Sequence, residues 1–189
     1  MSDALQLLLN LDQDAIRATS ELRCGPATAI LTLASAWWVK GPLLVGAGWC
    51  VDLRCRRVFP LVALAATLSF FVASGLNAVM KALVDRGRPP EEIGFDALVG
   101  VPGSPSFPSG HAMTAFAVAA AVALLAPRLR WPVLGLAAVI GFSRVYLGVH
   151  FWLDVLAGAA LGAAIGLLVA SSLRRRAGAA SAAGTMPAG

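Results

Sequence analysis

Charged residues are scarce in this chain: they make up 13% of its 189 residues, whereas 58% are hydrophobic. Soluble domains carry about 25% charged residues, and the mean hydropathy of +0.77 also lies far on the apolar side. The composition therefore excludes an ordinary soluble domain and predicts an integral membrane protein.

Cysteine and histidine are nearly absent as well. Cys24, Cys50 and Cys55 form neither a CxxC pair nor a Cys/His ligand spacing, so the sequence predicts no disulfide framework and no zinc site. No basic patch is interleaved with aromatic residues, which argues against nucleic-acid binding despite a net charge of +5. The N-terminus lacks a signal-peptide pattern, so we expect the first spans to direct membrane insertion.

Five apolar stretches predict membrane spans, each of which needs about 20 mainly apolar residues. They cover residues 27–51, 58–84, 112–126, 133–147 and 151–173. The first is interrupted by Lys40 and the Gly41-Pro42 pair, so we expect it to be irregular. Residues 3–23 mix leucines with charged residues, a pattern typical of an interfacial amphipathic helix. The predicted fold class is all-α, a polytopic transmembrane bundle of about five spans plus this N-terminal helix.

The spans form one predicted domain, residues 1–176, followed by a disordered tail at 177–189. Basic residues between the spans alternate in a way that places eight arginines on one membrane face: Arg54, Arg56, Arg57, Arg128, Arg130, Arg174, Arg175 and Arg176. An excess of basic residues in short connections marks the cytoplasmic side. The loop at 85–110 and the turn near residue 148 are therefore expected on the extracytoplasmic face of the plasma (inner) membrane.

The first polar segment on that outer face is KALVDRGRP, residues 81–89. If the preceding helix continues through it, Lys81 and Arg88 project from one side until Pro89 stops the helix. A simpler interpretation is a basic pair at a helix end, with Lys81 bonded to Asp85.

The second segment is PSFPSGHAMTAF, residues 105–116. Ser109 or Gly110 is expected to be the N-cap of a helix, so that free backbone amides point outward beside His111. Such amides bind anions, and a glycine lets the anion approach the backbone closely. An ordinary capped helix that happens to carry a histidine also fits this segment.

The third segment is SRVYLGVHFWLD, residues 143–154. We expect a turn at Gly148 between Arg144 and His150, with Asp154 on the same helix face as an exposed His150. A hydrogen bond to this carboxylate would leave the other ring nitrogen unprotonated, as in a nucleophilic histidine. The alternative is an interfacial His–Asp pair that only satisfies itself.

Together the three segments place both histidines of the chain beside a cluster of cations. Lys81, Arg88 and Arg144 would repel a metal ion, whereas their donors match the oxygens of a phosphate group. The sequence therefore predicts a phosphate-binding site that could stabilise charge during phosphoryl transfer.

The motifs K-x6-RP (81–89), PSGH (108–111) and SR-x5-H-x3-D (143–154) resemble the three-part signature of the phosphatidic acid phosphatase type 2 (PAP2) superfamily, in the same order. The resemblance implies that the phosphoryl group is bound by Lys81, Arg88, Ser109, the Gly110 amide and Arg144. It further implies that His150 attacks phosphorus, that Asp154 orients His150, and that His111 protonates the leaving oxygen. No metal or cofactor is implied.

Members of this superfamily include soluble acid phosphatases, vanadium haloperoxidases, glucose-6-phosphatases and membrane lipid phosphatases. The apolar spans and small size favour the lipid phosphatases, and the chain is similar in size to undecaprenyl-diphosphatases. The expected substrate is thus undecaprenyl diphosphate at the membrane. Phosphatidylglycerophosphate or phosphatidic acid is the alternative substrate, and a prenyl phosphate or phosphosugar-lipid phosphatase or a lipid phosphotransferase remains a further enzymatic alternative. An anion-binding membrane protein is the non-enzymatic one.

Overall fold

The computed structural model describes residues 3–36, 44–54 and 60–183, and over these ranges the chain is all-α, as predicted. The α-helices are α1 (Asp3–Ser20), α2 (Gly25–Ala34), α3 (Leu44–Arg54), α4 (Leu61–Val84), α5 (Pro89–Ile93), α6 (Gly110–Leu125), α7 (Arg130–Tyr146) and α8 (Trp152–Ala183). A short 3-10 helix, η2 (Pro127–Leu129), joins α6 to α7.

Two helical segments are long and apolar enough to cross a membrane: residues 61–93, which hold α4 and α5, and residues 152–179 of α8. The helices α2 and α6 are apolar but shorter. The stretch predicted as one irregular span at 27–51 holds two helices, α2 and α3, and the chain around Lys40 lies outside the described residues.

The C-terminal segment differs from the prediction. Residues 177–183 were expected to be disordered, but α8 continues through them to Ala183. The physical reason is that this stretch, AGAASAA, is rich in alanine, the residue with the highest helix propensity, and it extends an existing helix without a new nucleation step. Residues 184–189 lie outside the described ranges.

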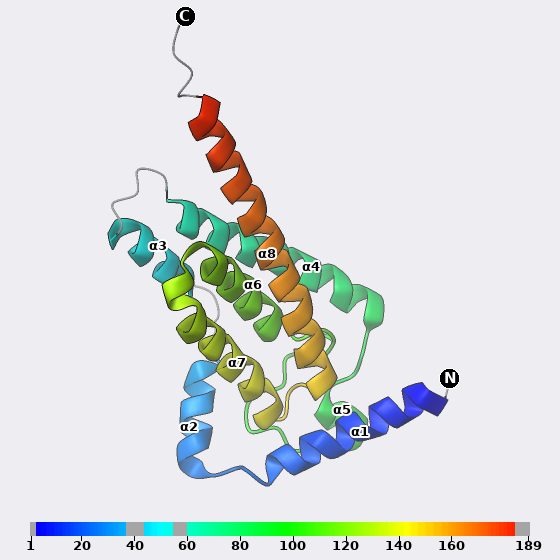
Figure 1. Cartoon of the computed structure of the whole chain (residues 1–189). Coiled ribbons are helices and arrows are strands. Elements are labelled where there is room, and N and C mark those ends of the chain that lie inside the picture. The colour runs from blue at the N-terminus through cyan, green and yellow to red at the C-terminus, as the bar shows by residue number, and fades with distance from the viewer. Residues whose placement is uncertain (1–2, 37–43, 55–59, 184–189) are drawn as a thin grey trace, which may run out of the picture.

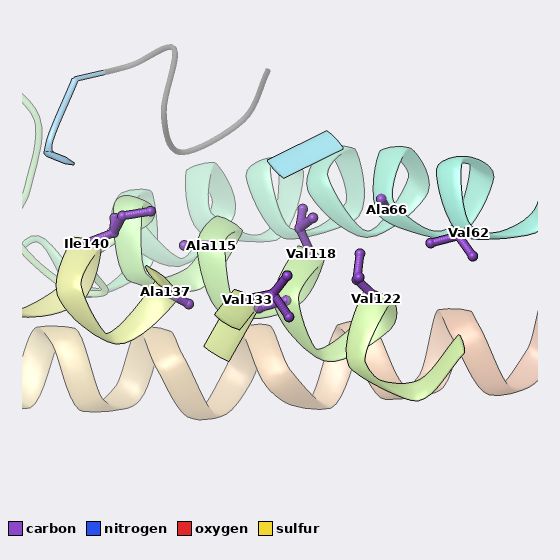
Figure 2. Close-up of a cluster of buried hydrophobic side chains, with 9 residues drawn as sticks. Val62, Ala66, Ala115, Val118, Val122, Val133, Ala137 and Ile140 are labelled. Atoms are coloured by element: carbon purple, nitrogen blue, oxygen red, sulfur yellow. The ribbon is translucent and has the colours of Figure 1, made fainter. Parts of the chain in front are cut away.

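Helix α6 lies at the centre of the bundle, between α4, α7 and α8 (Figure 1). Its sequence is apolar on every side, as expected for a helix that is surrounded by others. A cluster of nine buried residues joins it to α4 and α7 (Figure 2). These residues are Val62, Ala66, Ala115, Val118, Ala119, Val122, Val133, Ala137 and Ile140. Four of them are alanines, whose small side chains let the helix axes approach closely.

Helices α6 and α8 approach each other closely. Gly158, Gly162 and Gly166 recur at every fourth position of α8, so they share one face of the helix. A Cβ atom on Gly162 would lie 2.1 Å from the carbonyl oxygen of Met113, and one on Gly166 would lie 2.1 Å from that of Ala117. These glycines therefore let the two backbones touch.

The two ends of the bundle differ in what covers them. Helix α1 lies across the end where α8 begins, while the end of α3 and the α6–α7 connection lie at the other end (Figure 1). Arg54 and Arg128 line one cavity of about 450 Å³ at that other end. These two arginines therefore lie on the same side of the bundle, as the sequence predicted.

We predict that Gly162→Ala destabilises the fold by about 1–3 kcal/mol, because the new methyl group would overlap the backbone of α6. The measurement is thermal unfolding in detergent. Gly75→Ala in α4 is the matched control, since a Cβ there meets nothing within 4 Å; alanine should leave stability unchanged or raise it by up to about 1 kcal/mol. Equal unfolding temperatures for the two variants would contradict the packing argument.

Candidate active site

A cavity of about 310 Å³ lies beside the end of α4 and the beginning of α6. It is lined by Asn77, Ala78, Lys81, Arg88, Pro102, Ser104, Gly110, His111, Arg144 and His150. The folded chain thus brings all three predicted segments to one cavity. Of the eight residues predicted for the site, only Ser109 and Asp154 lie outside its lining.

His150 lies in the turn that precedes α8, not on the helix as predicted, and its Nδ1 is 3.4 Å from Oδ2 of Asp154. The turn is permitted by Gly148, whose φ of 79° is unfavourable for other residues. The expectation that His150 is exposed is wrong, because it is only 2% exposed. The pairing with Asp154 is therefore made inside the protein, where it is shielded from water.

The hydrogen bonds of His150 define its tautomer. Nε2 lies 3.3 Å from Nη1 of Arg88, and a guanidinium can only donate, so Nε2 must be an unprotonated acceptor. The proton is then on Nδ1, facing Asp154 and the hydroxyl of Ser106, which is 3.3 Å away. Burial lowers the pKa of His150 to about 4, and the neighbouring guanidinium groups of Arg88 and Arg144 also act against its protonation. His150 is thus a neutral imidazole whose unprotonated Nε2 lies beside Arg88, another residue of the cavity lining.

Asp154 is held by several donors at the beginning of α8. Its Oδ2 accepts from the backbone N–H of Phe151 at 2.9 Å and from the hydroxyl of Ser106. Its Oδ1 accepts from Nη1 of Arg86 at 2.7 Å. The carboxylate is completely buried, and this set of donors compensates for its desolvation.

Arg88 reaches the cavity by a different route from the one predicted. Helix α4 ends at Val84, Asp85 adopts a left-handed conformation with φ of 42°, and Pro89 begins α5 rather than ending α4. The segment between the helices is held because Arg88 donates from Nε to the carbonyl of Ser104 at 2.9 Å and from Nη1 to that of Val149 at 2.6 Å. Arg88 and Lys81 therefore meet through a turn and not along two turns of one helix.

Lys81 and Arg144 complete the basic part of the lining. Nζ of Lys81 donates to the hydroxyl of Ser104 at 3.2 Å and to the carbonyl of Pro105. Arg144 contacts the hydroxyl of Ser35 through Nη1, and its buried Nε has no hydrogen-bond partner among the described residues. A buried donor without a partner is rare in proteins, and it is suited to binding an anion.

The beginning of α6 carries the second predicted segment, and Ser109 is its N-cap as expected. The backbone N–H of Ser109 donates to the carbonyl of Asp154 at 2.9 Å, so it is not available to a ligand, whereas its buried hydroxyl has no partner in the described part of the chain. Nε2 of His111 lies 3.1 Å from the carbonyl oxygen of Ser35. A Cβ on Gly110 would lie 2.8 Å from Oδ1 of Asn77, so a larger residue there would require the Asn77 side chain to move.

Several residues that shape the site were not predicted: Asp12, Ser35, Asn77, Arg86, Ser104 and Ser106. Asn77 lies one helical turn before Lys81 and donates to the carbonyl of Pro108 at 3.0 Å, a position that the helical period could have suggested. Ser106 belongs to the second motif segment. Nothing in the local sequence pattern indicates the contacts of Asp12 and Ser35, because they come from helices far away in the chain.

The arrangement combines an unprotonated imidazole nitrogen, a second histidine and three cationic side chains around one cavity. Cations at this density favour an anionic ligand, and planar guanidinium groups match the oxygens of a phosphate. Among the described residues no group of three His, Cys, Asp or Glu side chains could hold a metal ion. The chemistry that this lining supports is binding of a phosphoryl group and attack on it by His150.

Comparison with known proteins agrees with this chemistry. The sequence profile of the PAP2 superfamily matches residues 62–177. Decaprenylphosphoryl-5-phosphoribose phosphatase from Mycobacterium tuberculosis is 40% identical over 131 residues, which cover 69% of this chain and 71% of that protein. Undecaprenyl-diphosphatase from Sulfolobus acidocaldarius is 36% identical over 110 residues, covering 57% of this chain and 53% of that protein. The match spans about half the length of the first curated relatives.

The fold is also similar to a solved structure. The transmembrane PAP2-type phosphatidylglycerolphosphate phosphatase from Bacillus subtilis superposes with a TM-score of 0.72 at 28% sequence identity. The superposition covers 93% of this chain and 88% of that protein. The overall arrangement of the helices is therefore shared with a membrane phosphatase.

We predict that the low pKa of His150 makes stability pH-dependent. Between its ordinary pKa of about 6.5 and the folded value of about 4, the unfolded chain binds a proton that the folded chain does not, so stability falls as pH decreases through this window. From pH 7 to pH 5 the wild type should lose about 1–2 kcal/mol more than His150→Gln. Denaturant unfolding in detergent at both pH values measures this, and identical losses would show that His150 titrates normally.

Proposed function

The chain belongs to the PAP2 superfamily, and from that premise we propose that it is a membrane lipid phosphatase acting through a phosphohistidine on His150. The observation that carries this proposal is the orientation of the His150 ring. Its Nδ1 faces Asp154 and its unprotonated Nε2 faces Arg88, and both His150 and Arg88 line the cavity together with Lys81 and Arg144. A non-enzymatic anion-binding protein would need the three cations but not a histidine held in this tautomer.

The proposed reaction has two steps. In the first, Nε2 of His150 forms a bond to phosphorus while the bond from phosphorus to the lipid-side oxygen breaks, and that oxygen takes a proton from His111. In the second, water gives a proton to His111 and attacks phosphorus, which releases phosphate and restores His150. Lys81, Arg88 and Arg144 would bind the phosphoryl oxygens, with the hydroxyl of Ser109 and the Gly110 amide as further ligands.

The proposed setting is the plasma membrane, with about five spans and the cavity on the extracytoplasmic face. Support comes from the basic residues at the opposite end of the bundle, among them Arg54 and Arg128. Helix α1 is proposed to lie in the interface, because Leu5, Leu8 and Leu11 are exposed on it. In that setting a lipid could keep its chain in hydrocarbon while its headgroup reaches the cavity.

We propose undecaprenyl diphosphate as the substrate. Two of the similar proteins are named for polyprenyl-linked lipids, one an undecaprenyl-diphosphatase and one a decaprenylphosphoryl-5-phosphoribose phosphatase. The similarity to a solved phosphatidylglycerolphosphate phosphatase makes phosphatidylglycerophosphate the second candidate. Hydrolysis of phosphatidic acid and transfer of a phosphoryl group between lipids would use the same catalytic groups. An activity assay is therefore needed to distinguish these alternatives.

The first test compares phosphate release from undecaprenyl diphosphate, phosphatidylglycerophosphate and phosphatidic acid by purified protein in EDTA. The wild type should release phosphate, most rapidly from undecaprenyl diphosphate, and His150→Gln should abolish release because an amide cannot form the phosphohistidine. Because His150 is buried, the unfolding temperature of the variant is measured alongside. Wild-type turnover in a folded His150→Gln protein would exclude the proposed nucleophile, and a different order of substrates would replace the proposed lipid.

We predict that Arg144→Lys lowers kcat/KM by about 100-fold, because an ammonium group cannot reproduce the two parallel donors of a guanidinium on phosphate. Arg128→Lys is the matched control, since Arg128 is exposed and lines the cavity at the other end of the bundle. Steady-state kinetics on the preferred lipid decide the matter. A loss below about 3-fold in Arg144→Lys would show that the geometry of the guanidinium is not required.

A further inference from the structure

Two residues outside the cavity form a continuous charged chain that ends at the proposed catalytic pair. We propose that Arg86 and Asp12 are positioning residues: Asp12, on α1, holds Arg86 against Asp154, and Arg86 thereby orients the carboxylate that aligns His150. This inference rests on the proposed phosphoryl transfer by His150. It assigns a role in that reaction to the N-terminal helix.

The contacts form a line from the surface helix to the catalytic histidine. Nη2 of Arg86 lies 3.0 Å from Oδ2 of Asp12, and its Nη1 lies 2.7 Å from Oδ1 of Asp154. Asp154 in turn contacts Nδ1 of His150 through Oδ2. The guanidinium of Arg86 thus bridges two carboxylates, a geometry that a planar group with several parallel donors can adopt.

The bridge between Asp12, Arg86 and Asp154 is largely shielded from water. The side chains of Asp12 and Asp154 are 1% and 0% exposed, and that of Arg86 is 13% exposed. Arg86 also lies over the ring of Phe151, with its Cζ 4.2 Å from the ring centroid, so its guanidinium is fixed from one face as well. If Arg86 is removed, Oδ1 of Asp154 loses a charged donor in a place that water does not reach.

Asp12 is held in place by its own helix. Asp12, Ile16 and Thr19 lie on one face of α1 at helical spacing, and all three are buried. Oδ1 of Asp12 accepts from the backbone N–H of Leu153 at 3.0 Å. Thr19 accepts from Nε1 of Trp152 at 3.0 Å. Helix α1 is therefore attached directly to the first turn of α8, across the end of the bundle (Figure 1).

The two residues act at a distance from the phosphate. Neither Asp12 nor Arg86 lines the cavity that holds Lys81, Arg88 and His150. They should therefore affect the alignment of His150 during attack without affecting how tightly the phosphoryl group binds. Two readouts together distinguish positioning residues from ligands of the phosphoryl group: both kinds of variant lower kcat, but only the loss of a ligand also weakens inhibition by inorganic phosphate.

The experiment is a double-mutant cycle with Asp12→Asn, Arg86→Gln and both together, assayed on the preferred lipid. Asparagine keeps an oxygen for the N–H of Leu153 but loses the charge that holds Arg86. We expect each single variant to lose about 10-fold or more in kcat, with KM and the inhibition constant of inorganic phosphate unchanged. The double variant should be no slower than Arg86→Gln alone, because Asp12 acts through Arg86.

Asp14→Asn is the matched control, since it makes the same change on the exposed side of the same helix and should retain wild-type kcat. Unfolding temperatures are recorded for every variant. Multiplicative losses in the double variant, or a kcat of Asp12→Asn equal to that of Asp14→Asn, would overturn the inference while leaving the phosphatase proposal in place. An inactive wild type, or an active His150→Gln, would instead overturn the proposed function and this inference with it.

Discussion

The burial of the Asp154 carboxylate is the constraint on which the rest of the site depends. A buried carboxylate is stable only when its oxygens accept hydrogen bonds or ion pairs. Here the donors come from separate parts of the chain: Arg86 after α4, Ser106 before α6 and the backbone of Phe151. The backbone carbonyl of Asp154 accepts from the backbone N–H of Ser109. The hydrogen bonds of this one acidic residue therefore form only when two connecting segments and the beginnings of α6 and α8 are correctly placed relative to one another.

The charge distribution follows from this arrangement. Asp154 forms an ion pair with Arg86, which lies outside the cavity lining, whereas Lys81, Arg88 and Arg144 all line the cavity. An electrostatic field of one sign is thus concentrated on a small volume, which favours an anion over any other ligand. His150 remains neutral there because burial disfavours its charged form, and Arg88 and Arg144 would also repel a proton on it.

The sequence predicted which residues line the cavity better than it predicted how the backbone positions them. Lys81, Arg88 and His150 were identified because they lie in polar segments that the sequence places on one membrane face and that resemble the three-part signature of the family. The turn at Asp85 and the place of His150 before α8 could not be read, since both depend on hydrogen bonds to distant segments. Asp12 and Ser35 were missed for the same reason. Local periodicity describes a helix, but it contains no information on which helix covers which end of a bundle.

The glycines of α8 have a consequence for motion. Because Gly158, Gly162 and Gly166 bring its backbone against that of α6, the two helices cannot slide or rotate past each other without steric overlap. The helix that begins beside His111 and the helix that begins beside His150 therefore form one stiff frame. Any movement that opens the site to a lipid therefore has to come from the elements around α6 and α8. One such element is α2, whose C-cap residue Ser35 contacts both His111 and Arg144.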